Sequence, residues 1–309
     1  LSVLVFYTVS GGPFGVEESV RSGGSCLALF GFISMFCCWS IPEAWMTAEL
    51  GAAIPCASGS VAWVEKAWGP FAAWMTGYLS WISGVTDNAL YPALFLAYVE
   101  QAMSVEGPKS DTIFNPWLRF TFQAGFVCIL AFINWIGLRA VGDVSLGSCA
   151  LTMSPFAVLS LVGMTQCQPS RWFELPSAGV LKGVRWRPLL NNLFWNLNSF
   201  DSVASFSTDV ESHQIYVHSI CLGLVLIFAG YVFPLAIVLG ATDASQDDWV
   251  DGYFVKVASE IAGPWLGRWL VVASAVSNVS LFQADFSTAI LQMQGMAERG
   301  NIPKILSLK

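Results

Sequence analysis

Charged residues are scarce in this 309-residue chain: they make up 11% of it, whereas hydrophobic residues make up 55%. Because soluble domains carry about 25% charged residues, a fully water-exposed surface is excluded. Several apolar segments exceed the roughly 20 residues that a helix needs to cross the bilayer core. The composition therefore predicts an all-α integral membrane protein that crosses the bilayer several times.

Residues for metal, redox or nucleophilic chemistry are also missing. The chain has two histidines, and its eight cysteines form no C-x-x-C pair. A histidine-rich metal site is therefore excluded, and we expect no cofactor. No nucleophile–base pair or phosphate-binding loop stands at a plausible membrane boundary, which argues against an enzyme. The chain has no initiator Met and no visible signal peptide, so we expect it to be incomplete at both ends.

Basic residues are fewer than acidic ones, 14 against 21, and the net charge is −7. An acidic balance argues against nucleic acid as a partner. It is compatible with a cationic solute, although acidic loops more often reflect simple solvation.

What the chain does contain is a series of long apolar segments, two of which are broken. The eight expected spans are 1–22, 25–53, 70–99, 117–138, 144–165, 189–210, 215–241 and 264–296. Glycine and proline interrupt the first span at 11–15, and polar residues interrupt the sixth at 196–202. Paired breaks of this kind are typical of secondary transporters with inverted repeats, whose binding sites form at the unwound backbone.

The spacing of the two breaks predicts one membrane transport domain over 1–309, built from two repeats. Residues 1–165 would form a first five-helix repeat, and residues 189–309 an incomplete second one. Longer loops are expected at 100–116, 166–188 and 242–263.

Acidic residues stand where lipid is expected, without basic residues to neutralise them. They are Glu17, Glu18, Glu43, Glu49, Asp87, Asp201 and Asp285. Ionisable groups at membrane depth cost about 2.5–3.5 kcal/mol each on insertion scales and usually face a pathway. Protons and a cationic substrate are the two candidates for neutralising these groups.

Two spans place such a residue on a polar stripe. In the third span the stripe is Ser80, Gly84, Asp87, Tyr91, Leu94 and Tyr98. In the eighth it is Ser274, Asn278, Leu281 and Asp285. Helical spacing puts each set on one face, which could line a cavity or form a helix–helix seam. A seam does not explain an unpaired Asp87, so we favour a cavity for the third span; for the eighth both readings stay open.

The first break frees backbone amides that would suit a substrate carboxylate. Glu17 and Glu18 follow in the first helical turn, where they compete with such an anion. This arrangement favours a substrate without a carboxylate, such as a polyamine. The second break combines stacking surface, amide groups and a carboxylate, although Trp195 could equally face lipid.

Six ordered segments resemble the plant- and protist-type polyamine/proton symporters of the amino acid–polyamine–organocation superfamily, near the L-type amino acid transporters. The segments are 11–17, 39–44, 83–92, 193–202, 249–254 and 295–303. The resemblance implies a twelve-helix transporter with a LeuT-like core, of which this chain lacks the last four helices. It also implies proton-coupled uptake of putrescine or spermidine across a membrane, most plausibly the plasma membrane, with an endomembrane as the alternative.

These observations lead to a set of candidate site residues. The candidate substrate-binding residues are Gly11, Gly12, Phe14, Glu43, Asp87, Tyr91, Trp195, Asn198, Phe200 and Asp201. Asp87 and Asp201 would pair with ammonium groups, Glu43 would be a third acidic site, and Glu17 or Glu43 would carry the coupling proton.

Tyr91, Trp195 and Phe200 would contact the methylene stem of a polyamine. Two alternatives remain: an L-type or cationic amino acid transporter, or a truncated relative that does not transport. Expected partners are a polyamine or amino acid, protons and the lipid bilayer.

Overall fold

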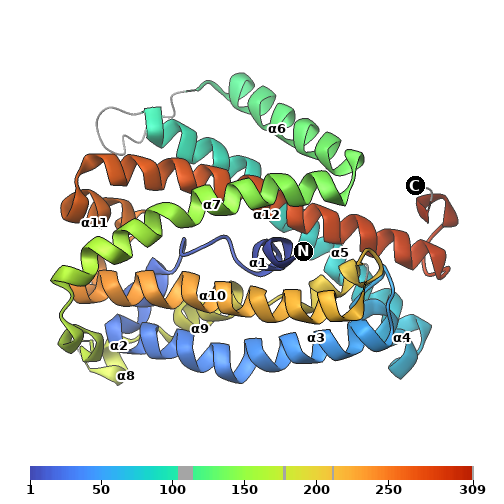
Figure 1. Ribbon diagram of the computed structural model, residues 1–309, viewed down its shortest axis with the longest axis horizontal. Helices are drawn as coiled ribbons and strands as arrows, with labels where there is room; N and C mark the ends of the chain where they lie inside the picture. Colours follow the sequence, from blue (N-terminus) through green and yellow to red (C-terminus); the bar gives the residue numbers. More distant parts are fainter. Residues whose placement is uncertain (104–113, 177–178, 211, 308–309) are drawn as a thin grey trace.

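The computed structural model describes residues 1–103, 114–176, 179–210 and 212–307, and these residues form helices and connecting loops without strands (Figure 1). Five helical runs in the described part are long and apolar enough to cross a membrane. They are Glu17–Ala53, Pro116–Ile136, Leu138–Gln166, His213–Ala241 and Pro264–Glu298. The expectation of an all-α, multi-pass membrane protein is thereby confirmed.

The first expected break separates two helices. Helix α1 (Ser2–Val9) ends before the glycines, and α2 (Glu17–Met35) begins after them. Gly24 interrupts α2 with a φ of 76°, a conformation that favours glycine, and a Cβ there would meet Pro176. This kink coincides with the expected boundary between the first two spans.

Helix α2 continues through a π-helical turn, η1 (Phe36–Ser40), into α3 (Ile41–Ala53). The next elements are α4 (Ser60–Trp68), α5 (Pro70–Met103), α6 (Pro116–Ile136), α7 (Leu138–Gly163), η2 (Met164–Gln166), η3 (Pro169–Phe173) and α8 (Val180–Gly183).

The second expected break is also present. Two residues separate helix α9 (Trp186–Leu197) from the 3₁₀ segment η4 (Phe200–Thr208). The remaining elements are α10 (His213–Ala241), η5 (Gln246–Asp248), α11 (Tyr253–Ala262), α12 (Pro264–Glu298) and η6 (Lys304–Ser307).

Helix α1 lies near the centre of the molecule and contacts α7, α10 and α12 (Figure 1). The side chains from Leu4 to Val9 are all buried. A helix that is apolar on every side belongs in the interior of a bundle, and its packing there brings the first break into the core.

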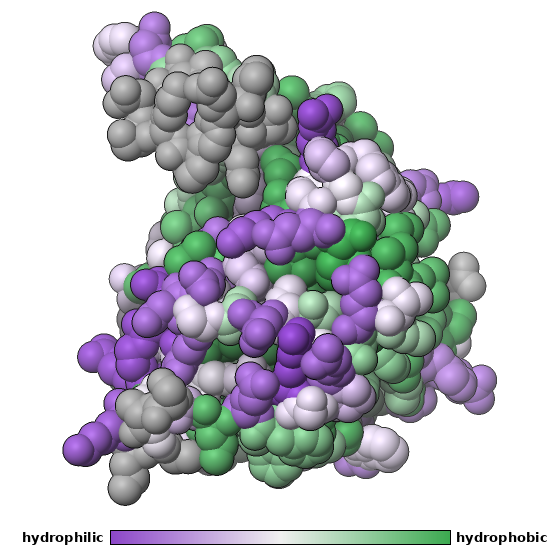
Figure 2. All heavy atoms as spheres, turned by 90° about the vertical axis from the view of Figure 1, so that its left-hand side faces the viewer, coloured by the Kyte–Doolittle hydropathy of each residue, from purple (hydrophilic) through white to green (hydrophobic). Residues whose placement is uncertain are grey.

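One end of the bundle is markedly polar. It carries α8, α11 and the kinked start of α2, and Figure 2 shows hydrophilic residues gathered across it. The flank beside them is hydrophobic in the same view. This distribution fits a protein whose helix ends meet water while its sides meet lipid.

Two helices and one helix start differ from the sequence-based expectation. Helices α4 and α11 lie in segments that were expected to be connectors, and α7 begins at Leu138 rather than at 144. The charged Arg139 and Asp143 fit into the first turns of α7 because both side chains are exposed.

Close helix packing makes one glycine critical for stability. A Cβ at Gly295 of α12 would lie 2.0 Å from the backbone nitrogen of Ser58, so Gly295→Ala forces the two backbones apart. Overpacking of this kind costs about 1–3 kcal/mol. We expect a lower melting temperature in detergent.

The matched control is Gly147→Ala in α7, where nothing lies within 4 Å of the added methyl group. Equal melting temperatures for the two variants would contradict the observed contact between α12 and Ser58.

Candidate substrate site

A cavity of about 1060 Å³ lies where the two breaks meet. Its lining comes from both breaks, from α5, α9 and α12, and from the start of α11. Such a cavity inside an otherwise apolar bundle is large enough for a small organic substrate.

Most of the candidate site residues lie on this cavity. The lining includes Gly11, Phe14, Glu17, Asp87, Tyr91, Trp195, Asn198 and Asp201. Gly12, Glu43 and Phe200 are not among the lining residues. Phe200 has no exposed surface and packs in the hydrophobic core, so a methylene stem in the cavity would not reach it without rearrangement.

The lining is acidic and contains no Lys, Arg or His within the described residues. Its acidic members are Glu17, Glu18, Asp87, Asp201, Asp251 and Asp285. Glu18 forms ion pairs with Arg21 and Arg185, at 4.0 and 3.5 Å. The other five have no ion-pair partner in the described part of the chain, so a proton or a bound cation would have to neutralise them.

Both polar stripes face the cavity, from two helices that pack against each other. All members of the α5 stripe and of the α12 stripe line it. The stripes meet where the Tyr91 hydroxyl donates a hydrogen bond to Asp285 Oδ2 at 2.5 Å. Asp87 lies one helical turn from Tyr91, so two carboxyl groups flank one phenol in the middle of α5.

The backbone of the first break is held by side chains of other helices. Gly12 and Gly15 adopt φ values of 93° and 79°, which only glycine adopts easily. The Gly11 carbonyl accepts a hydrogen bond from Ser277 of α12, and the Gly15 carbonyl accepts one from Asn192 Nδ2 at 2.8 Å. The break is therefore a fixed structure rather than a loose loop.

Glu17 closes the start of the helix that follows the first break. Its side chain is buried, with 3% exposure, and its carboxyl faces the backbone N–H groups of Gly15, Glu17 and Phe254. One carboxyl oxygen, Oε2, is buried without a hydrogen-bond partner. Glu17 thus supplies an anion where the positive end of the helix needs one.

Glu43 has the same relation to the second break. Its Oε1 accepts a hydrogen bond from the backbone N–H of Asp201 at 3.4 Å, and its Oε2 is buried without a partner. Ser199 has a φ of 85°, and Ser40 donates to the Leu197 carbonyl at 2.7 Å. Side chains of η1 and α3 therefore cap both ends of this break.

Trp195 faces the cavity rather than lipid alone. The side chain is 59% exposed and lines the cavity, and its Cζ3 atom lies 3.9 Å from the position that a Cβ would take at Gly15. This position answers the question of orientation that the sequence left open.

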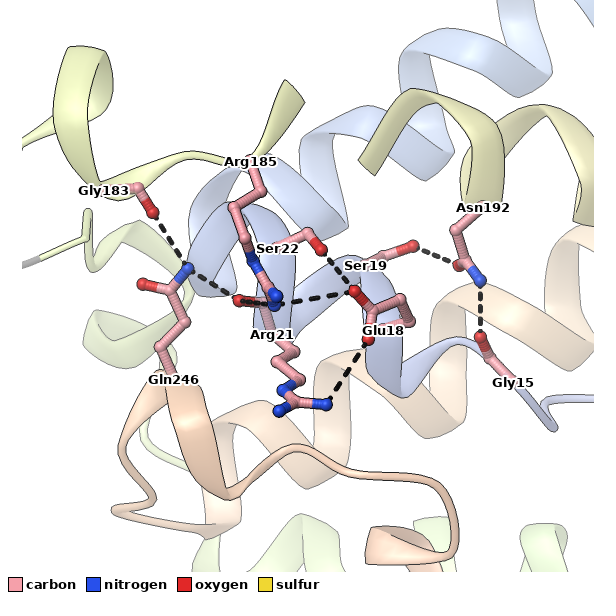
Figure 3. A network of polar contacts seen from close by, with 9 residues as sticks. All are labelled: Gly15, Glu18, Ser19, Arg21, Ser22, Gly183, Arg185, Asn192 and Gln246. Carbon is pink, nitrogen blue, oxygen red and sulfur yellow. Dashed lines mark hydrogen bonds and ion pairs between the residues drawn. The ribbon is translucent and has the colours of Figure 1, made fainter. Parts of the chain in front are cut away.

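A polar network ties the two broken helices together (Figure 3). Asn192 of α9 accepts a hydrogen bond from Ser19 Oγ at 2.5 Å and donates to the Gly15 carbonyl. Arg185 pairs with Glu18, and its guanidinium also donates to the Arg21 carbonyl at 3.1 Å. The segment after the first break and the helix before the second one are therefore joined.

The loop that carries Gln246 joins the same network. Gln246 donates to the carbonyls of Arg21 and Gly183, at 2.9 and 3.2 Å (Figure 3). A capping box of Ser245 and Asp248 holds the short η5 segment that carries Gln246. Hydrogen bonds from the side chain and backbone of Ser245 lower the pKa of the Asp248 carboxyl.

Sequence reasoning missed two residues of this site. Asp251 was assigned to a solvated loop, yet it lines the cavity next to α11. Its place within the 249–254 segment, which carried part of the family resemblance, was the available signal. Asn192 gave no signal, because its role depends on the contact between two distant segments. Among the described residues, no group of three His, Cys, Asp or Glu side chains could hold a metal ion.

Comparisons with known proteins identify the family and the relatives of this chain. The amino acid permease family profile matches residues 1–307. The chain is 39% identical over 308 residues to the polyamine transporter RMV1 of Arabidopsis thaliana, covering 99% of this chain and 61% of that protein. It is 37% identical over 310 residues to the polyamine transporter PUT1 of Oryza sativa subsp. japonica, covering 100% of this chain and 56% of that protein.

A further Arabidopsis thaliana relative, named as a probable polyamine transporter, is 40% identical over 308 residues, covering 99% of this chain. The chain spans 60% of that protein's length. These names describe transporters and not enzymes.

The Asn192 contacts lead to a stability prediction. Asn192→Leu leaves the Gly15 carbonyl and the Ser19 hydroxyl without their partner, and an unpaired buried polar group costs about 1–3 kcal/mol. We expect a lower melting temperature in detergent than for Asn191→Leu, the adjacent exposed position for which the structure shows no hydrogen bond. An equal effect of both substitutions would show that the bridge contributes nothing to stability.

Proposed function

Because the chain belongs to the amino acid permease family, we propose that it forms the substrate-binding part of a secondary active transporter for polyamines such as putrescine and spermidine. The observation that carries this proposal is the cavity between the two breaks, whose lining has six carboxyl groups and no basic side chain among the described residues. The names of the relatives support it.

The electrostatic reason is simple. Carboxylates at membrane depth need a counterion, and the described lining offers none of its own. A polyamine brings several ammonium groups on an apolar stem without adding any negative charge. Its binding therefore neutralises the cavity, whereas an anionic or neutral solute leaves the charges uncompensated.

Individual residues have distinct parts in this proposal. Asp87 of α5 and Asp201 of η4, which both line the cavity, would pair with separate ammonium groups. Tyr91 and Trp195 would contact the methylene stem, since aromatic faces attract ammonium groups as well as hydrocarbon. Phe200 would support the second break from the core.

The proposed architecture is a LeuT-like inverted repeat in a single membrane transport domain. Eight spans would be present, with the first and sixth broken, and the repeats would comprise 1–165 and 189–309. The two separated helix pairs, α1 with α2 and α9 with η4, support this assignment. We place the transporter in the plasma membrane and propose protons as the coupling ion.

A rival function is the transport of amino acids, which the family name suggests. Amino acids carry a carboxylate, which would have to share a cavity with six acidic side chains. The rival therefore makes a different prediction: neutral or cationic amino acids should compete for uptake.

Uptake measurements test the assignment of the site. In polyamine-uptake-deficient cells that express the complete gene, we expect uptake of labelled spermidine. Asp87→Asn and Asp201→Asn should each reduce it by about tenfold or more, because an ammonium group loses its charged partner. Asp247→Asn is the control, since Asp247 is exposed and outside the cavity. Full uptake by both cavity variants would refute these roles.

A pH series tests the coupling. If Glu17 or Glu43 carries a proton together with the substrate, uptake should rise as the external pH falls. Glu43→Gln, or Glu17→Gln if that residue is the carrier, should abolish the pH dependence because a neutral amide cannot exchange the proton. Uptake that is equal at acidic and alkaline external pH would exclude proton symport.

A further inference from the structure

We infer that Glu17 and Glu43 are specificity-determining residues, which exclude amino acids from the cavity by occupying both backbone sites where a substrate carboxylate could bind. This inference rests on the proposed polyamine function and goes beyond it, because it assigns the rejection of carboxylates to particular residues. It also explains why two acidic side chains are placed against the breaks.

A broken helix normally offers an anion site. The N–H groups at the start of the second half have no intrahelical partners, and the helix dipole adds partial positive charge. A substrate carboxylate fits there in carriers of this architecture. The two breaks of this chain create two such starts, one at Glu17 and one at Phe200.

In this chain a glutamate carboxyl lies at each start. The Glu17 carboxyl lies close to the N–H groups of Gly15 and Glu17 at the first, and Glu43 accepts a hydrogen bond from the Asp201 N–H at the second. Glu17 is the first residue of the helix that follows its break, whereas Glu43 reaches the second break from α3. Each also leaves one buried oxygen without a partner.

Those unpartnered oxygens strengthen the exclusion. An incoming carboxylate would meet a glutamate carboxyl, with one buried oxygen that has no partner, at each of the two starts. Glu17 is 3% exposed, and the carbonyls of the first break are bonded to Ser277 and Asn192, so its side chain has little freedom to move aside. An ammonium group meets the opposite situation, because a buried carboxyl oxygen is free to accept from it.

This geometry predicts discrimination between an amino acid and its decarboxylated product. Putrescine, cadaverine and agmatine are ornithine, lysine and arginine without the carboxyl group. Each pair shares its cationic end and differs only in the group that the glutamates would reject. Selectivity within a pair therefore reports on the exclusion alone.

The test is a competition assay with the protein from the complete gene, reconstituted in nanodiscs and loaded with labelled putrescine. For the unmodified protein we expect each diamine or agmatine to compete at least tenfold better than its parent amino acid. Glu17→Ala vacates the first backbone site. The advantage of each amine over its parent amino acid in competition should therefore fall at least tenfold. Glu17→Asp keeps the carboxylate and should retain the discrimination, and Asp247→Asn serves as an unrelated control.

The outcomes separate the two proposals. No binding of putrescine to the unmodified protein would refute the polyamine function itself. Binding of putrescine with equal competition by ornithine would leave that function intact and refute the exclusion. If Glu17→Ala does not fold, Glu43→Ala applies the same test to the second break. If a folded variant of either glutamate prefers each amine over its parent amino acid as strongly as the unmodified protein does, that glutamate does not exclude carboxylates.

Discussion

A helix that stops inside a bundle leaves backbone N–H and C=O groups without intrahelical partners, and the rest of this structure follows from the need to pair them. Ser277 and Asn192 bond the carbonyls of the first break, and Ser40 and Glu43 bond the second. These four side chains belong to different elements, α12, α9, η1 and α3. Satisfying the breaks therefore fixes the relative positions of helices that are far apart in the sequence.

The same requirement shapes the electrostatics. A serine or asparagine pairs a carbonyl without adding charge, but a free N–H at a helix start is best paired with an anion. Glu17 and Glu43 fill that need, so part of the negative charge near the cavity serves the fold. Asp87 and Asp201 have no such role at the first break, and under the proposed function they bind the substrate. The carboxyl groups in and near the cavity would thus have two different tasks.

The sequence predicted the long helices and both breaks closely, because length, hydropathy and glycine or proline content are local properties. It also predicted the stripes of α5 and α12, since helical periodicity fixes which residues share a face. Helices α4 and α11 were missed because short amphipathic helices resemble polar loops. The roles of Asn192 and Asp251 were missed as well, because they depend on contacts between segments that no local pattern connects.

Glu43 was predicted to bind the substrate, yet it lies outside the cavity lining and bonds the backbone of the second break. A π-helical turn at Phe36–Ser40 comes just before α3, the helix that carries Glu43. A π-turn accommodates one more residue than an α-turn, and this change in winding is not visible in hydropathy.

That turn carries an implication for how the chain tolerates change. An α-helix advances by about 100° for each residue, so removing a residue from the regular α-helical part of α2 would rotate everything beyond it by that angle. Glu43 would then turn away from the second break, even though no residue touching the break had been altered. The π-turn differs, because it can lose its surplus residue and close into an α-turn while the helices on either side keep their orientation. A single-residue deletion should therefore be tolerated better within Phe36–Ser40 than elsewhere in this helix.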